Sequence, residues 1–442
     1  ERRIRLCQFS ATQRDRLDER QRLGGILAQA FPEPKAWPVA EAARFGHDLL
    51  AIADPLASEK SLQESSRELV VSALKRASPG EAEAMFLGTL RQCHQPGPHY
   101  ACQGLLQEMA DQRPEPQILC DWLMERSASE TEQELKDALA LAEHIQGQEQ
   151  CPDQVGLAQA TVLLRLADLG HEERRKQGEQ IAQSLTGSPL VGGKAQALLV
   201  RSFTTQVEYD EASGWLAAGM KDWPHEPDLR LARLFFFIKS GKLDQAFQAG
   251  EDGAADAATR EEMDGQCLSS MAQVVAQKED WRLNATRLIG LKHPCRRLLT
   301  MLLYARLGAK TGKDQHVLED AWSQIHRESW PERLRGADTA VWYEMLVGYY
   351  TGAVARKEIF DPLRDDQTFA SSGLQFLRRP RRWLSCEAHF YEALLAETRG
   401  DEVMKQAALK QLMGPDCRSR IEQGLGKYLL AGGDGALKRA NP

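Results

Sequence analysis

Two short segments of the chain share one pattern of residue types and begin 34 residues apart. Residues 207–212 read Val-Glu-Tyr-Asp-Glu-Ala, and residues 241–246 read Gly-Lys-Leu-Asp-Gln-Ala. Each segment follows an apolar run of helical periodicity, at 195–203 and at 229–238, and precedes a second short helical pattern. A period of this length constrains the chain to a series of helix–turn–helix units, because one unit alone cannot bury its apolar face.

The matched positions suit the place where two helices of a unit meet. Ala212 and Ala246 are small, so the second helix can approach the first closely. Gly241 can end the first helix in the left-handed backbone conformation, which costs other residues energy. Tyr209 and Leu243 occupy equivalent apolar positions and are expected to fill the space beside the turn.

This pattern resembles the tetratricopeptide repeat, a 34-residue helix–turn–helix unit. In that family the turn commonly reads Gly-Asp-Tyr-Asp-Glu-Ala, and a packing aromatic residue falls where Phe203 and Phe237 stand. The family's early Trp and its small residue on the first helix are replaced in both units, by Gln196, Val200, Arg230 and Leu234. The two units therefore read as degenerate repeats.

Weaker copies extend the resemblance over about residues 151–430. Helical patterns lead into glycine turns at Gly170, Gly312, Gly352 and Gly400, and Asp280-Trp281 marks one more unit. The resemblance implies a right-handed α-solenoid of helix pairs. We predict three parts: an N-terminal helical domain at 1–129 without a 34-residue register, a repeat array at 130–430, and a flexible tail at 431–442.

Composition agrees with an all-α fold. The 442 residues are 42% hydrophobic and 27% charged, which is typical of a globular chain. Ala, Leu, Gln and Glu are abundant and favour helix, and no alternating β-branched stretch is long enough to predict a sheet. No run of ~18 apolar residues occurs, so we predict no membrane span.

Charge and cysteine usage limit the partners and the compartment. The formal net charge of −7 removes any global attraction to phosphate backbones and disfavours nucleic acid as a partner. The nine cysteines are dispersed without a framework, which predicts free, mostly buried thiols in a reducing compartment. We therefore expect a cytoplasmic protein, and the sequence does not indicate an oligomeric state.

The resemblance implies that the first helices of the pairs line a concave groove that binds an extended peptide or a helix of another protein. Basic and aromatic side chains in such a groove suit an acidic or carboxylate-bearing segment with apolar anchors. The expected groove residues are Lys194, Arg201, Thr205, Phe235, Lys239, Arg306, Lys310, Trp342, Tyr349 and Tyr350. The alternative is that several of them pack between helices. The sequence thus predicts a non-enzymatic adaptor or scaffold without cofactor or metal.

Two other functions stay open. The first is a regulatory protein that sequesters a transcription factor or an enzyme in a bacterial signalling or CRISPR-associated defence system. The second is a zinc-binding helical protein or enzyme that uses Cys93, His94, His99 and Cys102, four possible ligands within ten residues. Their spacing matches no familiar finger, and an ordinary interhelical loop with cysteines at the helix ends explains them better.

Three further motifs are better explained by structure than by chemistry. The Gly-rich stretch 187–195 has five residues before its Gly-Lys pair and lacks the following hydroxyl, so it departs from a phosphate-binding loop. Cys386 and His389 share a helix face without a third catalytic group. The basic run 378–383 could contact RNA, DNA or an acidic partner, but such a run is more often a solvated loop.

Overall fold

The computed structural model describes residues 60–93, 99–129, 131–146, 151–251, 260–277, 354–371, 381–418 and 420–431, together with the positions 283–285, 299, 302–303, 305–306, 342, 345–346 and 348–350. Every regular element in these residues is an α-helix or a 3-10 helix, which confirms the predicted all-α class. None of these helices has both the length and the apolar character needed to cross a membrane.

The chain divides into two compact units. The first comprises residues 1–126, 141–155 and 327–337, and the second comprises 127–140, 156–326 and 338–442.

The described helices of the first unit are 12 to 17 residues long. They are α4 (Lys60–Arg76), α5 (Pro79–Cys93), α6 (His99–Gln112), α7 (Pro116–Ser127) and the second part of α8 (Glu132–Gln146). α4, α5 and α6 pack against one another. The guanidinium of Arg113 donates to the carbonyl oxygens of Leu74 and Ala77, each at 2.8 Å, and so satisfies the last carbonyls of α4.

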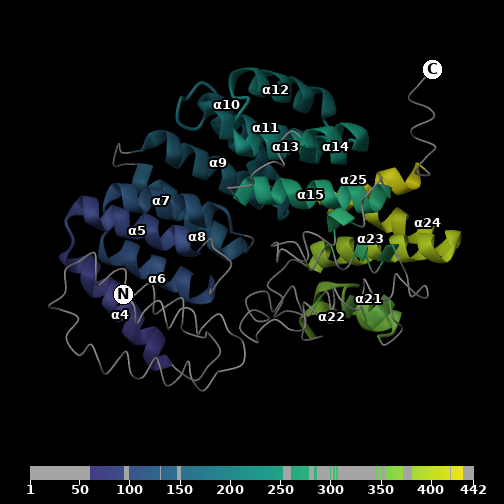
Figure 1. Ribbon diagram of the computed structural model, residues 1–442, viewed down its shortest axis with the longest axis horizontal. Coiled ribbons are helices and arrows are strands. Elements are labelled where there is room, and N and C mark those ends of the chain that lie inside the picture. The colour runs from purple at the N-terminus through teal and green to yellow at the C-terminus, as the bar shows by residue number, and fades with distance from the viewer. Residues whose placement is uncertain are drawn as a thin grey trace. The chain divides into compact units, whose positions relative to one another are not determined.

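The second unit begins with a run of helices that pack in pairs. They are α9 (Pro152–Asp168), the 3-10 turn η2 (Glu172–Arg174), α10 (Arg175–Leu185), α11 (Gly192–Gln206), α12 (Tyr209–Asp222), α13 (Pro227–Lys239), α14 (Leu243–Glu251) and α15 (Arg260–Ala276). α11 packs against α12 and α13, and α13 packs against α14 and α15 (Figure 1). Each first helix of a pair thus contacts both its own second helix and the first helix of the next pair.

Four helices of this unit end with the same backbone turn. The residue with positive φ is Gly170 (+112°), Val207 (+69°), Gly241 (+77°) or Gly400 (+73°). After α13, for example, the N–H of Lys242 donates to the carbonyl of Phe237 at 2.8 Å, the bond that closes such a helix end. The predicted left-handed role of Gly241 is confirmed, and the weaker turns expected at Gly170 and Gly400 have the same geometry.

The C-terminal part of the second unit adds a further helix pair and a last helix. Its elements are α21 (Arg356–Phe360), α22 (Asp366–Ser371), α23 (Arg381–Arg399), α24 (Glu402–Leu412), η4 (Pro415–Cys417) and α25 (Ile421–Leu430). α23 packs against α24, and α25 contacts α13, α15, α23 and α24 (Figure 1). One core cluster of buried side chains therefore includes Leu234 and Ile238 of α13 together with Leu425 and Leu429 of α25.

The cysteines correct one expectation. Cys120 and Cys151 form a disulfide in the first unit, and Cys386 and Cys417 form another in the second, with Cα–Cα distances of 6.8 Å and 5.6 Å. Cys267 is disulfide-bonded as well. The prediction of free thiols is therefore wrong for these five residues. In the two described bridges, cysteines 31 positions apart in the chain meet in the fold. Disulfides persist in oxidising compartments, so the cysteines no longer favour the cytoplasm.

Candidate partner-binding face

Small residues bring the helices of the best-matched repeats close together. Ala212 of α12 and Ala246 of α14 are both fully buried, as their repeat positions predict. Gly219 lies seven residues after Ala212 on the same face of α12 and is packed even more tightly. A Cβ at Gly219 would lie 2.5 Å from Oε1 of Gln196 and 2.8 Å from Cδ2 of Leu229. The joint between α11, α12 and α13 thus depends on the absence of a side chain at Gly219.

Tyr209 fills the space beside the first turn and also makes polar contacts. Its ring meets Phe236 edge to face, with ring centroids 6.1 Å apart. Its hydroxyl donates to the carbonyl oxygen of Lys239 at 2.8 Å and accepts from Nζ of Lys427 at 2.8 Å. Tyr209 therefore joins three elements: the start of α12, the end of α13, and α25.

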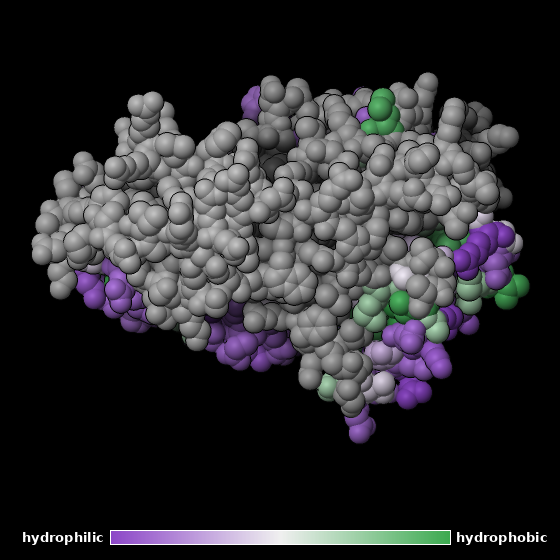
Figure 2. All heavy atoms as spheres, turned by 60° about the horizontal axis from the view of Figure 1, so that its bottom comes forward, coloured by the Kyte–Doolittle hydropathy of each residue, from purple (hydrophilic) through white to green (hydrophobic). Residues whose placement is uncertain are grey.

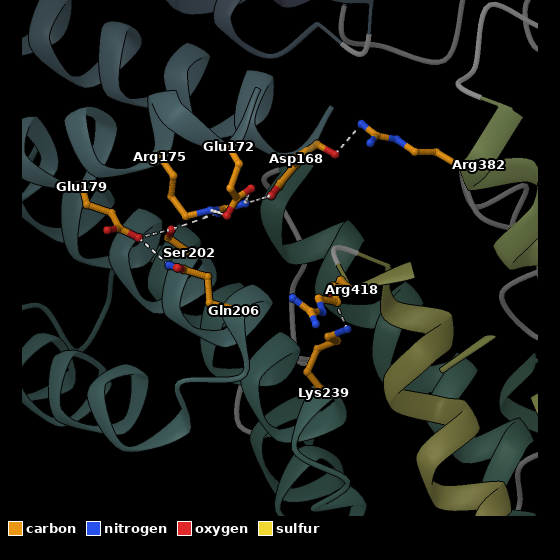
Figure 3. Close-up of polar contacts among 9 residues, drawn as sticks. All are labelled: Asp168, Glu172, Arg175, Glu179, Ser202, Gln206, Lys239, Arg382 and Arg418. Carbon is orange, nitrogen blue, oxygen red and sulfur yellow. Dashed lines mark hydrogen bonds and ion pairs between the residues drawn. The ribbon is translucent and has the colours of Figure 1, made fainter. Parts of the chain in front are cut away.

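Lys239, an expected groove residue, is fully buried. Its Nζ donates to the carbonyl oxygens of Arg418 at 2.6 Å and Arg420 at 2.9 Å, and to Oε1 of Gln423 at 3.2 Å. Figure 3 shows the amine directed at the chain segment that carries Arg418. A buried ammonium is tolerable only when its hydrogens have acceptors, and here three oxygens supply them.

Burial also changes the acidity of this amine. Loss of hydration and, to a smaller extent, the nearby positive charge of Lys427 lower the pKa of Lys239 from its usual value, the carboxylate of Glu422 opposes them, and the resulting pKa is about 7. The amine can therefore gain or lose its proton close to neutral pH.

Arg420 extends the same cluster towards α23. Its guanidinium donates to the buried carboxylate of Glu387 at 2.9 Å and lies over the ring of Trp383, with the guanidinium carbon 5.1 Å from the ring centroid. Glu387 also accepts from the indole N–H of Trp342 at 3.0 Å. The start of α25 is thus held by charge-assisted hydrogen bonds from two sides.

A second polar cluster joins α9, η2, α10 and α11. The guanidinium of Arg175 lies 2.9 Å from a carboxylate oxygen of Asp168, 2.7 Å from one of Glu172 and 3.3 Å from the hydroxyl of Ser202 (Figure 3). Ser202 in turn donates to the carboxylate of Glu179 at 2.6 Å. These side chains use one another as partners, which is the pattern of a structural joint rather than of an open site.

The predicted groove residues fall into three groups. Among the described ones, Lys194 is exposed, and Arg201, Phe235 and Tyr349 are partly buried. Five are buried inside the chain: Thr205, Lys239, Arg306, Trp342 and Tyr350. Lys310 lies outside the described residues. Burial takes those five side chains out of the surface that a partner can touch in this conformation.

Buried and partly buried members of this set make contacts within the second unit. Arg306 hydrogen-bonds the carboxylate of Glu397 and the carbonyl oxygen of Val275. The hydroxyl of Tyr349 donates to Glu392 at 3.2 Å, and burial raises the pKa of Tyr349 to about 12. The structure brings Lys239 and Trp342 to the same cluster around the start of α25, but it does not join them to Lys194 or Arg201 through any described contact.

The other sequence motifs also have structural roles where they are described. In the Gly-rich stretch, a Cβ at Gly192 would lie 2.6 Å from the carbonyl oxygen of Thr186, so close packing explains the glycine. In the basic run, Arg381 bonds Asp366, and Arg382 donates to the carbonyl of Asp168 at 2.7 Å. The cysteine of the Cys386–His389 pair is in a disulfide.

The possible zinc residues are only partly placed. Cys93 ends α5, and His99 and Cys102 lie in the first turn of α6, while His94 and all four side chains fall outside the described residues. Within the described residues, no group of three or more His, Cys, Asp or Glu side chains could hold a metal ion. The zinc hypothesis therefore stays a prediction.

The exposed large hydrophobic side chains of the described residues do not gather in one patch. Figure 2 shows the described residues of one face as hydrophilic areas with smaller hydrophobic areas between them. The large hydrophobic side chains that are exposed among the described residues are scattered over different elements: Leu190, Val207, Leu283, Val403 and Leu430. Single exposed apolar residues of this kind are normal on a soluble surface.

Sequence reasoning missed the role of α25. Gly424 and Gln423 carry no motif, and the contact between α25 and α13 joins residues about 180 positions apart, for example Lys239 and Arg420.

Comparisons with protein-family models, with curated proteins and with solved structures each find no match to this chain.

Proposed function

We propose that the chain is a non-enzymatic adaptor or scaffold that binds a partner polypeptide along the first helices of a right-handed, tetratricopeptide-like array. One observation carries this proposal. The pairs α11–α12 and α13–α14 are successive in the chain, their turns lie 34 residues apart, and their first helices end in the same left-handed turn and pack on each other. Repeated helix pairs of this kind present a continuous face suited to an extended chain or a helix.

Three of the expected groove residues are at least partly exposed and could contact a partner. Lys194 on α11 is exposed, and Arg201, seven residues later on the same helix, is partly exposed. Phe235 on α13 is partly exposed as well, so the open part combines two cations with an aromatic side chain. Such a surface suits a partner segment that carries carboxylates next to an apolar anchor.

The test is partner capture by the full chain from its native host. We expect Lys194→Glu combined with Arg201→Glu to reduce the captured partner at least ~10-fold, because two attractive charges become repulsive. Lys221→Glu, at an exposed position of α12, is the matched control and should leave capture unchanged. Unchanged capture by the double variant would contradict the proposed face. A captured transcription factor or enzyme that loses activity when bound would identify the protein as a sequestering regulator.

A further inference from the structure

The surface at the C-terminal end of α13 is already occupied by another helix of the chain. α25 packs on α13, and the buried side chains Leu425 and Leu429 share one core cluster with Leu234 and Ile238. This end of α13 carries Lys239, which the repeat register assigns to the partner groove. A helix of the chain itself thus covers a position that the repeat register assigns to the groove.

The fit between the two helices is close enough for their backbones to touch. A Cβ at Gly424 would lie 2.7 Å from the carbonyl oxygen of Ile238 and 2.7 Å from Cα of Lys239. Both atoms belong to backbone, which cannot move aside as a flexible side chain can. Only glycine therefore allows α25 to cross α13 at this distance, and the site selects for a helix with glycine at the crossing point.

Polar contacts fix the direction and the register of the bound helix. At its start, the amine of Lys239 binds two backbone carbonyls that precede α25 and the side chain of Gln423. One and a half turns later, Nζ of Lys427 reaches the hydroxyl of Tyr209 and lies 5.3 Å from the centroid of that ring. The two residues that contact α25 in this way, Tyr209 and Lys239, both belong to the two best-matched repeat units.

We propose that the C-terminal end of α13, together with Tyr209, is a helix-binding site that α25 occupies within the chain, and that the partner presents a helix of the same kind in its place. That partner helix carries glycine where it crosses Ile238 and Lys239, two free carbonyl oxygens before its first turn, and a cation opposite Tyr209. This proposal rests on the proposed function and names its partner class. α25 then acts as an internal competitor.

The covalent structure makes this competition strong. α25 begins four residues after Cys417, which is bonded to Cys386 of α23. A helix on so short a tether has an effective concentration in the millimolar range or above, so a free helix binds weakly while α25 stays docked. Weakening the docking of α25 must therefore strengthen the binding of a helix supplied from outside.

The experiment uses the full chain and a fluorescent peptide of residues 414–431 with Cys417→Ser, which prevents thiol exchange. Gly424→Leu in the full chain should eject α25, because its side chain meets backbone of α13. We expect the peptide, which keeps its own Gly424, to bind this variant at least ~10-fold more tightly than it binds the original chain. A peptide that itself carries Gly424→Leu should bind neither chain.

Two results would overturn the proposal: no tighter binding to the folded Gly424→Leu chain, or equal binding of the two peptides. If Gly424→Leu prevents folding, as judged by circular dichroism, Lys427→Ala in the full chain weakens the docking of α25 without a clash and leaves the hydroxyl of Tyr209 in place for Lys427 of the peptide. We expect a smaller gain in peptide binding from that variant, and no gain would equally overturn the proposal. The peptide assay needs no natural partner, so it can fail while the Lys194 and Arg201 test succeeds, and the reverse.

Discussion

The Nζ of Lys239 lies 2.6 Å from the carbonyl oxygen of Arg418, which is 179 residues further along the chain. This contact places a titratable cation at the interface of α13 and the segment that leads into α25. Its energetics are testable because the amine is fully buried and its pKa falls to about 7.

Stability should rise with pH above neutrality because of this lysine. In the unfolded chain the pKa of a lysine is about 10.4, so between pH ~7 and ~10 the unfolded chain binds a proton that the folded chain has released. The free energy of unfolding therefore increases with pH in that window, by at most ~1.4 kcal/mol per pH unit, and the effect levels off below pH ~7. Urea denaturation of the original chain and of Lys239→Met at pH 7, 8 and 9 measures it.

The difference in stability between the two chains should move in favour of the original chain as pH rises. A difference that stays constant from pH 7 to pH 9 would show that Lys239 keeps its proton throughout. The measurements stay below pH ~9.5, because partly buried Tyr349 and buried Tyr350, whose pKa values are raised, act in the opposite direction at higher pH.

Gly219 and Gly214 of α12 form a matched pair for testing the tight repeat joint. Nothing lies within 4 Å of a Cβ at Gly214, whereas one at Gly219 meets Gln196 and Leu229. We expect Gly214→Ala to stabilise the chain by up to ~1 kcal/mol through helix propensity. Gly219→Ala should destabilise it by ~1–3 kcal/mol through overpacking, because the added Cβ meets Gln196 and Leu229. Thermal unfolding of both variants decides the matter, and equal melting temperatures would refute the close contact.

Much of this joint could be predicted from sequence, because local turns leave local signals. The 34-residue match located the ends of α11 and α13 and the buried Ala212 and Ala246. The docking of α25 could not be predicted, because no periodicity links residues about 180 positions apart. The burial of Lys239 was missed for a different reason. Lysine is almost never fully buried, so a lysine on a helix face is assigned to the surface.

The two described disulfides allow a comparison at equal loop length. Both join cysteines 31 residues apart, so loop-closure entropy assigns each about 3–4 kcal/mol. We expect Cys386→Ala with Cys417→Ala to lower the free energy of unfolding more than Cys120→Ala with Cys151→Ala does. The reason is that Cys417 directly precedes the segment whose carbonyl oxygens, those of Arg418 and Arg420, bind Lys239. Hydrogen exchange should become faster across residues 421–430 in the first double variant alone. Equal protection of that segment in both variants would show that the disulfide does not support α25.

The equivalent turns after α11 and α13 predict that a substitution in each turn will change the free energy of unfolding in opposite directions. Val207 holds φ at +69° and Gly241 at +77°, yet only glycine adopts this conformation without steric cost. A β-branched side chain there is disfavoured by ~1–2 kcal/mol. Val207 is 42% exposed, so losing its side chain sacrifices little buried area. Val207→Gly should therefore stabilise the chain by ~1 kcal/mol, and Gly241→Val should destabilise it by at least as much. Chemical denaturation of the two variants tests both signs. Destabilisation by Val207→Gly would mean that packing of Val207, and not backbone strain, dominates at the first turn.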